Sequence, residues 1–209
     1  MGKSKKKKRF IMRVIDEIFP YIQKNKANKS LQKKINSIKD YLSYDDRRSV
    51  LKMFKSPEEA DLNILNDMLE DNKHRMERLE DKAKVQIVGI TIANSIIFGV
   101  AGNLKNISHN STCFKWVMYA VLIVSVIYMS SSGLEAINML INKNYFYYLP
   151  YNFSELEDDK KRRSYNAIIV KNQLQNTIRN NAISTSYTLM RNAILLLILV
   201  FAVWIIPIG

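Results

Sequence analysis

Three long stretches of the chain contain no charged side chain, and all the charged residues lie before or between them. The stretches are residues 85–104, 116–134 and 192–209. A water-soluble domain distributes its apolar residues with the period of a helix or a strand, whereas these blocks have the length and composition of membrane-spanning helices. The pattern therefore predicts an all-α, multi-pass membrane protein with three transmembrane helices.

The first 57 residues are predicted to form a basic, helical, cytoplasmic region. Apolar residues recur at helical spacing over residues 10–22, which predicts an amphipathic helix that ends near Pro20. A narrow apolar stripe over residues 31–42 predicts a second helix, and residues 50–54 suggest a short third one. Together with the region that follows, they make up an N-terminal cytoplasmic domain.

Residues 58–84 carry a heptad pattern and are predicted to form a helical stalk. The sequence Ser56-Pro57-Glu58-Glu59 is a helix-start signature, and no further Pro or Gly occurs before Gly89. We expect one helix of about 45 residues, roughly 70 Å long, that runs into the first membrane segment. Its seam either packs on helices of its own chain or associates with a second copy. The seam residues are Leu62, Leu65, Leu69, Asn72, Met76 and Leu79.

The first two membrane segments contain polar residues, whereas the third is almost uniformly apolar. Thr91, Asn94 and Ser95 lie near the middle of the first segment, and Ser125 lies in the second. Such residues either hold helices together inside the membrane or line a pore, and the two alternatives stay open. No acid or base lies within the three segments, which argues against a proton-coupled pump or a voltage sensor.

The region 135–191 is predicted to be a second cytoplasmic helical region. An aromatic cluster, Tyr145–Tyr148, precedes Pro150, and a run of acids followed by bases occupies residues 155–163. From residue 164 to residue 192 the chain has no Pro or Gly and is rich in amides and hydroxyls. This pattern predicts a long polar helix that continues into the third membrane segment, so that both the first and the third segments have long helical stalks.

The charge distribution predicts the topology. The chain has 32 Lys and Arg against 19 Asp and Glu, and 22 of these basic residues lie in residues 1–84, whereas the loop 105–115 has only two. Short basic flanks stay in the cytoplasm. We therefore expect a protein of the cell inner membrane with a cytoplasmic N-terminus, an external 105–115 loop, a cytoplasmic 135–191 region and an external C-terminus.

The interpretation of two further sequence features depends on the cell and the compartment in which the protein resides. The basic run at residues 3–9 is best interpreted as a tail attracted to anionic lipid headgroups, with nuclear localisation or nucleic-acid binding as the alternative. Asn106 and Asn110 begin glycosylation sequons that would be usable only in a eukaryote, where the chain would be an organellar membrane protein.

The chain offers little material for catalysis or metal binding. It has one cysteine, Cys113, and two histidines, His74 and His109, which excludes an internal disulfide framework and a cysteine-based zinc site. No Walker loop, no G-x-S-x-G and no H-E-x-x-H motif occurs. We expect no enzymatic activity, no catalytic residue, no metal site and no cofactor.

The layout of residues 70–209 resembles that of prokaryotic antiphage membrane effectors of nucleotide-signalling systems. The segment Arg78-Leu-Glu-Asp-Lys-Ala83 enters the first membrane segment, and Asp81, Lys82 and Ala83 match an acid-x-Lys-Ala element of these families without its intervening residue. The aromatic patch at residues 145–148 and the polar helix of residues 166–199 follow in the same order. The chain is most similar to the Pycsar transmembrane effector family, with the SLATT-type effectors next to it.

The resemblance implies a membrane effector that associates with itself in the lipid bilayer. Its signal would be a nucleotide second messenger or an oligonucleotide made by a companion nucleotidyltransferase or cyclase. The effector would assemble into a regulated ion channel or a membrane-disrupting homo-oligomer that depolarises the cell. Basic side chains could bind the phosphates of the signal. The candidates are Lys33, Lys34, Lys39, Lys171 and Arg179.

A second function is compatible with the same pattern. The chain would then be a non-conducting membrane anchor or scaffold that recruits a cytoplasmic partner through residues 1–84. The two functions differ in what they require of the first membrane segment. A channel needs its polar residues, whereas an anchor would tolerate their replacement by leucine.

Overall fold

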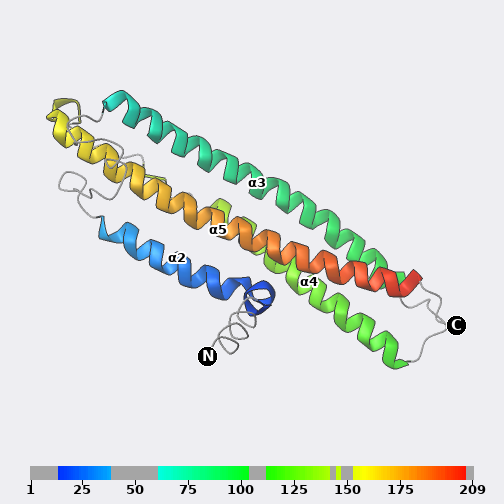
Figure 1. Ribbon diagram of the computed structural model, residues 1–209. Helices are drawn as coiled ribbons and strands as arrows, with labels where there is room; N and C mark the ends of the chain where they lie inside the picture. Colours follow the sequence, from blue (N-terminus) through cyan, green and yellow to red (C-terminus); the bar gives the residue numbers. More distant parts are fainter. Residues whose placement is uncertain (1–13, 39–60, 104–111, 142–144, 147–152, 206–209) are drawn as a thin grey trace, which may run out of the picture. The chain divides into compact units, whose positions relative to one another are not determined.

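The computed structural model describes residues 14–38, 61–103, 112–141, 145–146 and 153–205, and within these ranges the chain is all-α. The helices are α2 (Pro20–Ser37), α3 (Leu62–Asn103), α4 (Thr112–Ile141), the short 3-10 helix η4 (Phe153–Glu155) and α5 (Asp158–Ile205) (Figure 1). Residues 14–18 form a further turn of helix before α2. The predicted fold class is thus confirmed at the level of secondary structure. The expected third helix at residues 50–54 lies outside the described residues.

Local sequence explains where several helices begin. Pro20 starts α2, where its missing N–H costs nothing and its fixed φ suits a helix. Asp61 caps α3, since its Oδ1 accepts a hydrogen bond from the main-chain N–H of Asn63 at 2.9 Å. The expected helix start at residues 56–59 lies outside the described residues. Asp158 and Asp159 occupy the first turn of α5, where carboxylates oppose the positive end of the helix dipole.

The two long helices are continuous, as the absence of internal proline predicts. α3 has 42 residues and joins the heptad stalk to the first uncharged stretch without a break. α5 has 48 residues and joins the polar 158–191 segment to the third uncharged stretch. α4 continues past Leu134 as far as Ile141. As expected, α3 and α5 therefore each join a stalk to an uncharged stretch in one unbroken helix.

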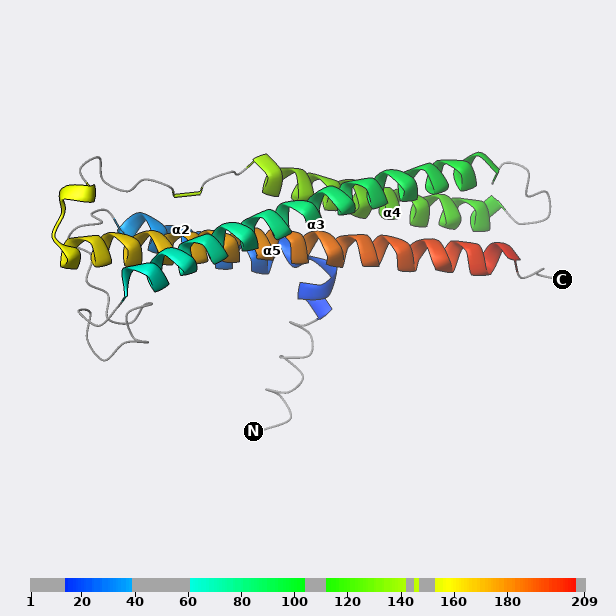
Figure 2. The same ribbon diagram turned by 90° about the horizontal axis from the view of Figure 1, so that it is seen from above.

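The chain divides into two compact units, and each long helix contributes to both. Unit 1 contains residues 1–24, 82–141 and 182–209, and unit 2 contains residues 25–81 and 142–181. Within unit 1, the C-terminal part of α3, all of α4 and the C-terminal part of α5 lie side by side, with α4 antiparallel to the other two (Figure 1, Figure 2).

The apolar core of unit 1 forms where its three helices meet. One cluster joins Ile97 of α3, Met118 and Leu122 of α4, and Leu197 and Val200 of α5. A second cluster joins one residue from each helix and lies nearer the other end of α4; it consists of Ile90, Met129 and Ala193. Small residues permit this close approach.

Gly89 of α3 is one such position, because a Cβ there would meet the Cε of Met190 at 3.3 Å. Gly133 of α4 packs against Ile90, which a Cβ would meet at 3.7 Å. Both glycines therefore lie where α3 contacts a neighbouring helix, and the contact is tightest at Gly89.

Unit 2 has a smaller apolar core and a more polar interior. Leu65 of α3 and Ile169 of α5 are its fully buried apolar centre, surrounded by Leu62, Leu69, Tyr165 and their neighbours. α2 turns one narrow stripe inward, and its members recur every three or four residues from Asn28 through Leu31 and Ile35 to Ile38. The predicted stripe is thus confirmed at Leu31, Ile35 and Ile38, but the predicted bounds of the second helix are not, because α2 begins at Pro20 and ends at Ser37, just before Ile38. Residues 39–42 of the predicted helix lie outside the described residues.

Exposed large apolar side chains are distributed unequally between the two units. Among the described residues, Ile64 is the only one of them in unit 2, and all the others belong to unit 1. On the three packed helices of unit 1 they include Val88, Phe98, Ile123, Ile127, Leu195 and Ile198. In the described part of the chain, unit 1 therefore presents far more apolar surface outward than unit 2.

Within the described ranges, two helices are long and apolar enough to cross a membrane, judged by length and composition. They are the Lys115–Ile141 part of α4 and the Asp158–Ala202 part of α5, and less than half of the most apolar window of each is buried within the chain. The third segment expected to span, residues 85–104, is helical in α3 as far as Asn103.

Candidate functional site

A buried polar cluster joins the three helices of unit 1 at one level. Ser132 of α4 and Ser186 of α5 are fully buried, and Gln86 of α3 is nearly so. The Ser132 hydroxyl lies 2.7 Å from the main-chain carbonyl oxygen of Ser186. The Ser186 hydroxyl lies 2.6 Å from the main-chain carbonyl oxygen of Ser132. The Gln86 Nε2 donates to the Ser132 Oγ at 3.4 Å. Such contacts are a common means of helix association where no water is available.

Asn94, Thr91 and Ser95, the candidates in the first uncharged stretch, have different environments. Thr91 and Ser95 are exposed, and each hydroxyl donates to the main-chain carbonyl four residues earlier, at 3.0 Å in both cases. Asn94 is half-buried, and among the described residues its Oδ1 is a buried oxygen without a hydrogen-bond partner. Asn94 is therefore the one of the three with an unmet requirement for a hydrogen bond.

Ser125, the candidate in the second stretch, is fully buried within unit 1. Its hydroxyl donates to the carbonyl oxygen of Val121 at 2.9 Å on its own helix. The structure thus does not bring the four sequence candidates together at one point. Ser125 faces the interior of the three-helix bundle, whereas Thr91 and Ser95 face outward.

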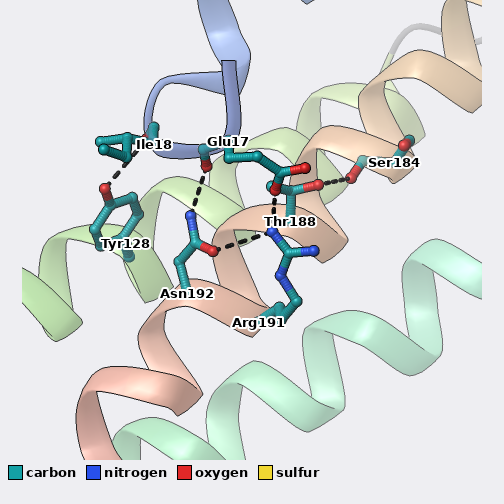
Figure 3. Close-up of polar contacts among 7 residues, drawn as sticks. All are labelled: Glu17, Ile18, Tyr128, Ser184, Thr188, Arg191 and Asn192. Carbon is teal, nitrogen blue, oxygen red and sulfur yellow. Dashed lines mark hydrogen bonds and ion pairs between the residues drawn. The ribbon is translucent and has the colours of Figure 1, made fainter. Parts of the chain in front are cut away.

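The N-terminal segment of unit 1 is held against α4 and α5 by polar contacts (Figure 3). The main-chain carbonyl of Ile18 accepts from the Tyr128 hydroxyl at 3.1 Å, and that of Glu17 accepts from Asn192 Nδ2 at 2.8 Å. The Glu17 carboxylate also forms an ion pair with Arg191, as Figure 3 shows. These contacts fix the turn of helix at residues 14–18 near the start of the last uncharged stretch.

Lys24 and Glu135 form an ion pair that is shielded from solvent. The side chain of Lys24 is 12% exposed and that of Glu135 is 5% exposed, so both charges have lost most of their hydration. The neighbouring Tyr21 hydroxyl donates to the carbonyl oxygen of Ser131 at 2.9 Å. Burial raises the pKa of the Tyr21 phenol, the bond to Ser131 lowers it, and the charge of Glu135 raises it, with a net increase. The phenol therefore remains a donor at neutral pH.

The interior of unit 2 contains buried amides and a guanidinium beside its aliphatic side chains. On α5, Asn166, Asn172 and Asn176 are fully buried, and Arg179 is 2% exposed. Asn176 Nδ2 donates to the carbonyl oxygen of Asn72 at 2.9 Å, and Arg179 Nη1 donates to Asn176 Oδ1 at 3.0 Å. Because buried polar groups are costly without partners, this network specifies how α3 and α5 pack within unit 2.

The side chain of Asn172 forms hydrogen bonds with both main-chain polar groups of Phe146. Its Oδ1 accepts from the N–H of Phe146 at 2.9 Å, and its Nδ2 donates to the carbonyl oxygen of Phe146 at 3.1 Å. The adjacent Tyr145 donates to the carbonyl oxygen of Leu69 at 2.9 Å. The Lys171 ammonium lies 5.2 Å from the centre of the Phe146 ring. The start of the predicted aromatic patch is thus packed into unit 2.

The basic residues proposed to bind a ligand do not form one site. Lys33 and Lys34 are exposed on α2, whereas Lys171 and Arg179 are buried in the interior of unit 2. Lys39 lies outside the described residues. Of the four candidates that the structure describes, Lys33 and Lys34 are accessible to a ligand from solution, and the two buried bases serve the contacts described above.

The heptad seam of α3 faces the interior of its own chain. Leu65, Asn72, Met76 and Leu79 are buried, and Leu62 and Leu69 are half-buried. Asn72 Nδ2 donates to the carbonyl oxygen of Met68 at 2.8 Å. This burial favours packing within the chain over self-association as the role of the seam.

Sequence reasoning missed the pairing of distant polar residues. Gln86 and the serines around residue 132 were visible as polar positions in apolar segments, but nothing in the pattern indicated Ser186 as their partner. The pair Lys24 and Glu135 is separated by 111 residues. Its one local signal is that Glu135 is the first charge after an uncharged stretch.

Among the described residues, no group of three or more His, Cys, Asp or Glu side chains could hold a metal ion. Comparison of the chain with protein-family models, with curated proteins and with solved structures finds no match.

Proposed function

We propose that the chain is a membrane effector whose unit 1 crosses a lipid bilayer three times and whose unit 2 lies in the cytoplasm. Copies of the chain would associate through the first membrane segment into a channel or a membrane-disrupting assembly that depolarises the cell. The observation that carries the proposal is the distribution of exposed apolar side chains, which are nearly confined to unit 1 among the described residues. In water this surface would be costly, whereas in hydrocarbon it would be matched.

The packing of α3 against α4 and α5 supports the proposal that α3 crosses the membrane with them. Gln86, Ile90 and Ile97 of α3 contact the other two helices at successive levels. A helix bound along its length to two membrane helices shares their environment. Residues 85–103 would measure about 28 Å at 1.5 Å per residue, close to the thickness of a hydrocarbon core.

Self-association is supported by a row of small and hydroxyl residues on the outer face of α3. Thr91, Ser95, Gly99 and Gly102 are all exposed and recur every three or four residues. A Cβ at Gly99 or Gly102 would meet nothing within 4 Å, so another helix has room to approach. Membrane helices associate through such small residues, and a neighbouring amide such as Asn94 strengthens the contact.

Antiphage defence and regulation by a nucleotide rest on the resemblance of residues 70–209 to prokaryotic effectors. The exposed Lys33 and Lys34 of α2 supply positive charge for a phosphate-bearing signal. The basic excess of residues 1–84 supports a cytoplasmic location for α2, on the side where a companion nucleotidyltransferase or cyclase would release its product.

The test is the membrane potential of a bacterium during inducible expression, read with a voltage-sensitive dye. The intact chain is expected to depolarise the cell and Gly99→Leu is expected to abolish this effect, because leucine blocks close approach at a site that is open within the single chain. Val88→Leu is the matched control, since Val88 is exposed and apolar on the same helix. Protein levels and resistance to carbonate extraction are measured for each variant.

Four outcomes separate the alternatives. Depolarisation by the intact chain and by Val88→Leu, but not by Gly99→Leu, supports the assembly. Full depolarisation by Gly99→Leu would overturn the role of the α3 face. A chain that resists extraction but never changes the potential, even with a nucleotide-producing partner, would be the non-conducting anchor, and a chain released by carbonate would contradict membrane crossing.

A further inference from the structure

The N-terminal segment of unit 1 presents its apolar side to the outside. Val14, Ile15, Ile18, Phe19 and Ile22 are between 39% and 61% exposed. A surface helix of a water-soluble protein does the opposite, because it buries its apolar stripe and hydrates its polar one. The reversed orientation means that water is the wrong solvent for this face.

The orientation is fixed by polar contacts on the opposite side of the segment. They run from residues 17–24 to two helices of the same unit. The contacts are Glu17 with Arg191 and Asn192, Ile18 with Tyr128, Tyr21 with Ser131, and Lys24 with Glu135 (Figure 3 shows the first three). The apolar residues are therefore held outward by specific bonds, and rotation of the segment to bury them would break these bonds.

The contacts also set the level of the segment along the bundle. Arg191 is the last charge before the uncharged stretch of α5, and Glu135 is the first charge after that of α4. Both mark the boundary between polar and apolar parts of their helices. Tyr128 lies seven residues from Glu135 on the apolar side, which is about 10 Å along the helix. Helices that lie in the plane of a membrane are buried about 5–10 Å into the boundary between headgroups and acyl chains.

We propose that residues 14–22 form an in-plane anchor that inserts its apolar side chains into the cytoplasmic leaflet of a bilayer containing anionic lipid. The proposal rests on the membrane crossing of unit 1 proposed above. Anionic lipid is indicated by charge, since six of the seven residues at positions 3–9 are Lys or Arg. A bilayer is favoured over a protein partner because the contacts described above hold the exposed apolar side chains at the level where the uncharged stretches of α4 and α5 meet the charged parts of their helices.

The test uses the full chain with spin labels in vesicles of phosphatidylcholine and phosphatidylglycerol. Single cysteines are placed by Ile18→Cys, Ile64→Cys and Ile198→Cys in a Cys113→Ser background. All three positions carry exposed isoleucines, so the labels should not disturb the core. The ratio of collision rates with molecular oxygen and with a water-soluble nickel chelate reports the depth of each label.

The expected order of depth is 198, then 18, then 64. The label at position 198 should lie deep in hydrocarbon, that at position 18 about 5–10 Å below the headgroups, and that at position 64 in water. Removal of phosphatidylglycerol should shift the label at position 18, and no other, toward water.

Each contrary result has a distinct meaning. A label at position 18 as accessible to nickel as that at position 64, with position 198 still deep, would overturn the anchor and leave the membrane crossing intact. Nickel access at position 198 would instead overturn the crossing. Spin–spin coupling between labels at position 18 would show that a second copy of the chain covers the segment. Equal depth in phosphatidylcholine alone would overturn the requirement for anionic lipid.

Discussion

Ser132 and Ser186 form a reciprocal contact, in which each hydroxyl lies within hydrogen-bonding distance of the other residue's main-chain carbonyl oxygen. The two hydroxyl oxygens are also 2.9 Å apart. Reciprocal contacts of this kind require the backbones of α4 and α5 to come close, which only small side chains permit. The Gln86 amide adds α3 to the same point, so one residue from each helix of unit 1 meets there.

Removal of either serine hydroxyl should weaken the bundle of unit 1. We expect Ser132→Ala and Ser186→Ala each to lower the free energy of unfolding by about 0.6–2 kcal/mol. Ser132→Ala should cost more, because it also deprives Gln86 Nε2 of its acceptor. The measurement is thermal and denaturant unfolding of the purified chain in detergent micelles.

The control for this pair is Ser130→Ala on the same helix, where the serine is exposed. It should change stability little. If all three substitutions had the same small effect, the Ser132–Ser186 contact would not hold the helices together.

Loss of one partner of the shielded ion pair should destabilise unit 1 strongly. Glu135→Gln leaves the Lys24 ammonium in a site that is only 12% exposed, and removal of one partner of a buried pair costs about 3–5 kcal/mol. The double replacement Lys24→Met with Glu135→Met should recover most of this loss, since no charge then remains in the site. Unfolding in detergent measures both effects.

Glu17→Gln provides the comparison, because the Glu17–Arg191 pair belongs to the same unit but its side chains are 60% and 54% exposed. Exposed pairs contribute about 0–1 kcal/mol. A loss for Glu135→Gln no larger than that for Glu17→Gln would show that the Lys24–Glu135 pair is hydrated and of little consequence.

The Asn172 side chain should be irreplaceable by aspartate, although the two have the same shape. Asn172→Asp keeps an acceptor for the Phe146 N–H but cannot donate to the Phe146 carbonyl, and it places a carboxylate in a fully buried position. We expect a loss of at least about 1–3 kcal/mol and faster hydrogen exchange of the Phe146 amide. Asn180→Asp, at an exposed position on the same helix, should leave that exchange rate unchanged.

The sequence allowed the helices to be predicted, because their signals are local. Continuity of α3 follows from the absence of Pro between residues 58 and 103, and the break before α2 follows from Pro20. The buried positions of α3 from Leu65 to Ala83 keep the heptad spacing that was read from the sequence.

The partners of the polar residues could not be predicted in the same way. Periodicity shows that residues 10–22 have an apolar side, but not that residues 14–22 turn this side outward, because the pattern is the same for a helix in water and at a membrane surface. The partners of Gln86, Lys24 and Asn172 lie on other elements, and no spacing along the chain encodes them.

Replacement of Asn94 by leucine should have different effects on the stability of the single chain and on its self-association. Its Oδ1 is buried and, among the described residues, lacks a hydrogen-bond partner, so Asn94→Leu should leave the stability of the single chain unchanged or raise it by up to about 1 kcal/mol. If a second copy supplies the missing donor, the same variant should lose self-association and depolarisation. Unfolding at high detergent dilution and cross-linking in membranes measure the two effects separately.

Ser125→Ala is the control for Asn94→Leu. Ser125 is buried in the same bundle, and its hydroxyl already has a hydrogen-bond acceptor on its own helix. This variant should change neither property by much. Unaltered cross-linking and depolarisation in Asn94→Leu would mean that no neighbouring copy reaches Asn94, and the outer face of α3 would then have to associate through its glycines and hydroxyls alone. A large loss of single-chain stability would instead mean that Asn94 supports the fold through its amide nitrogen.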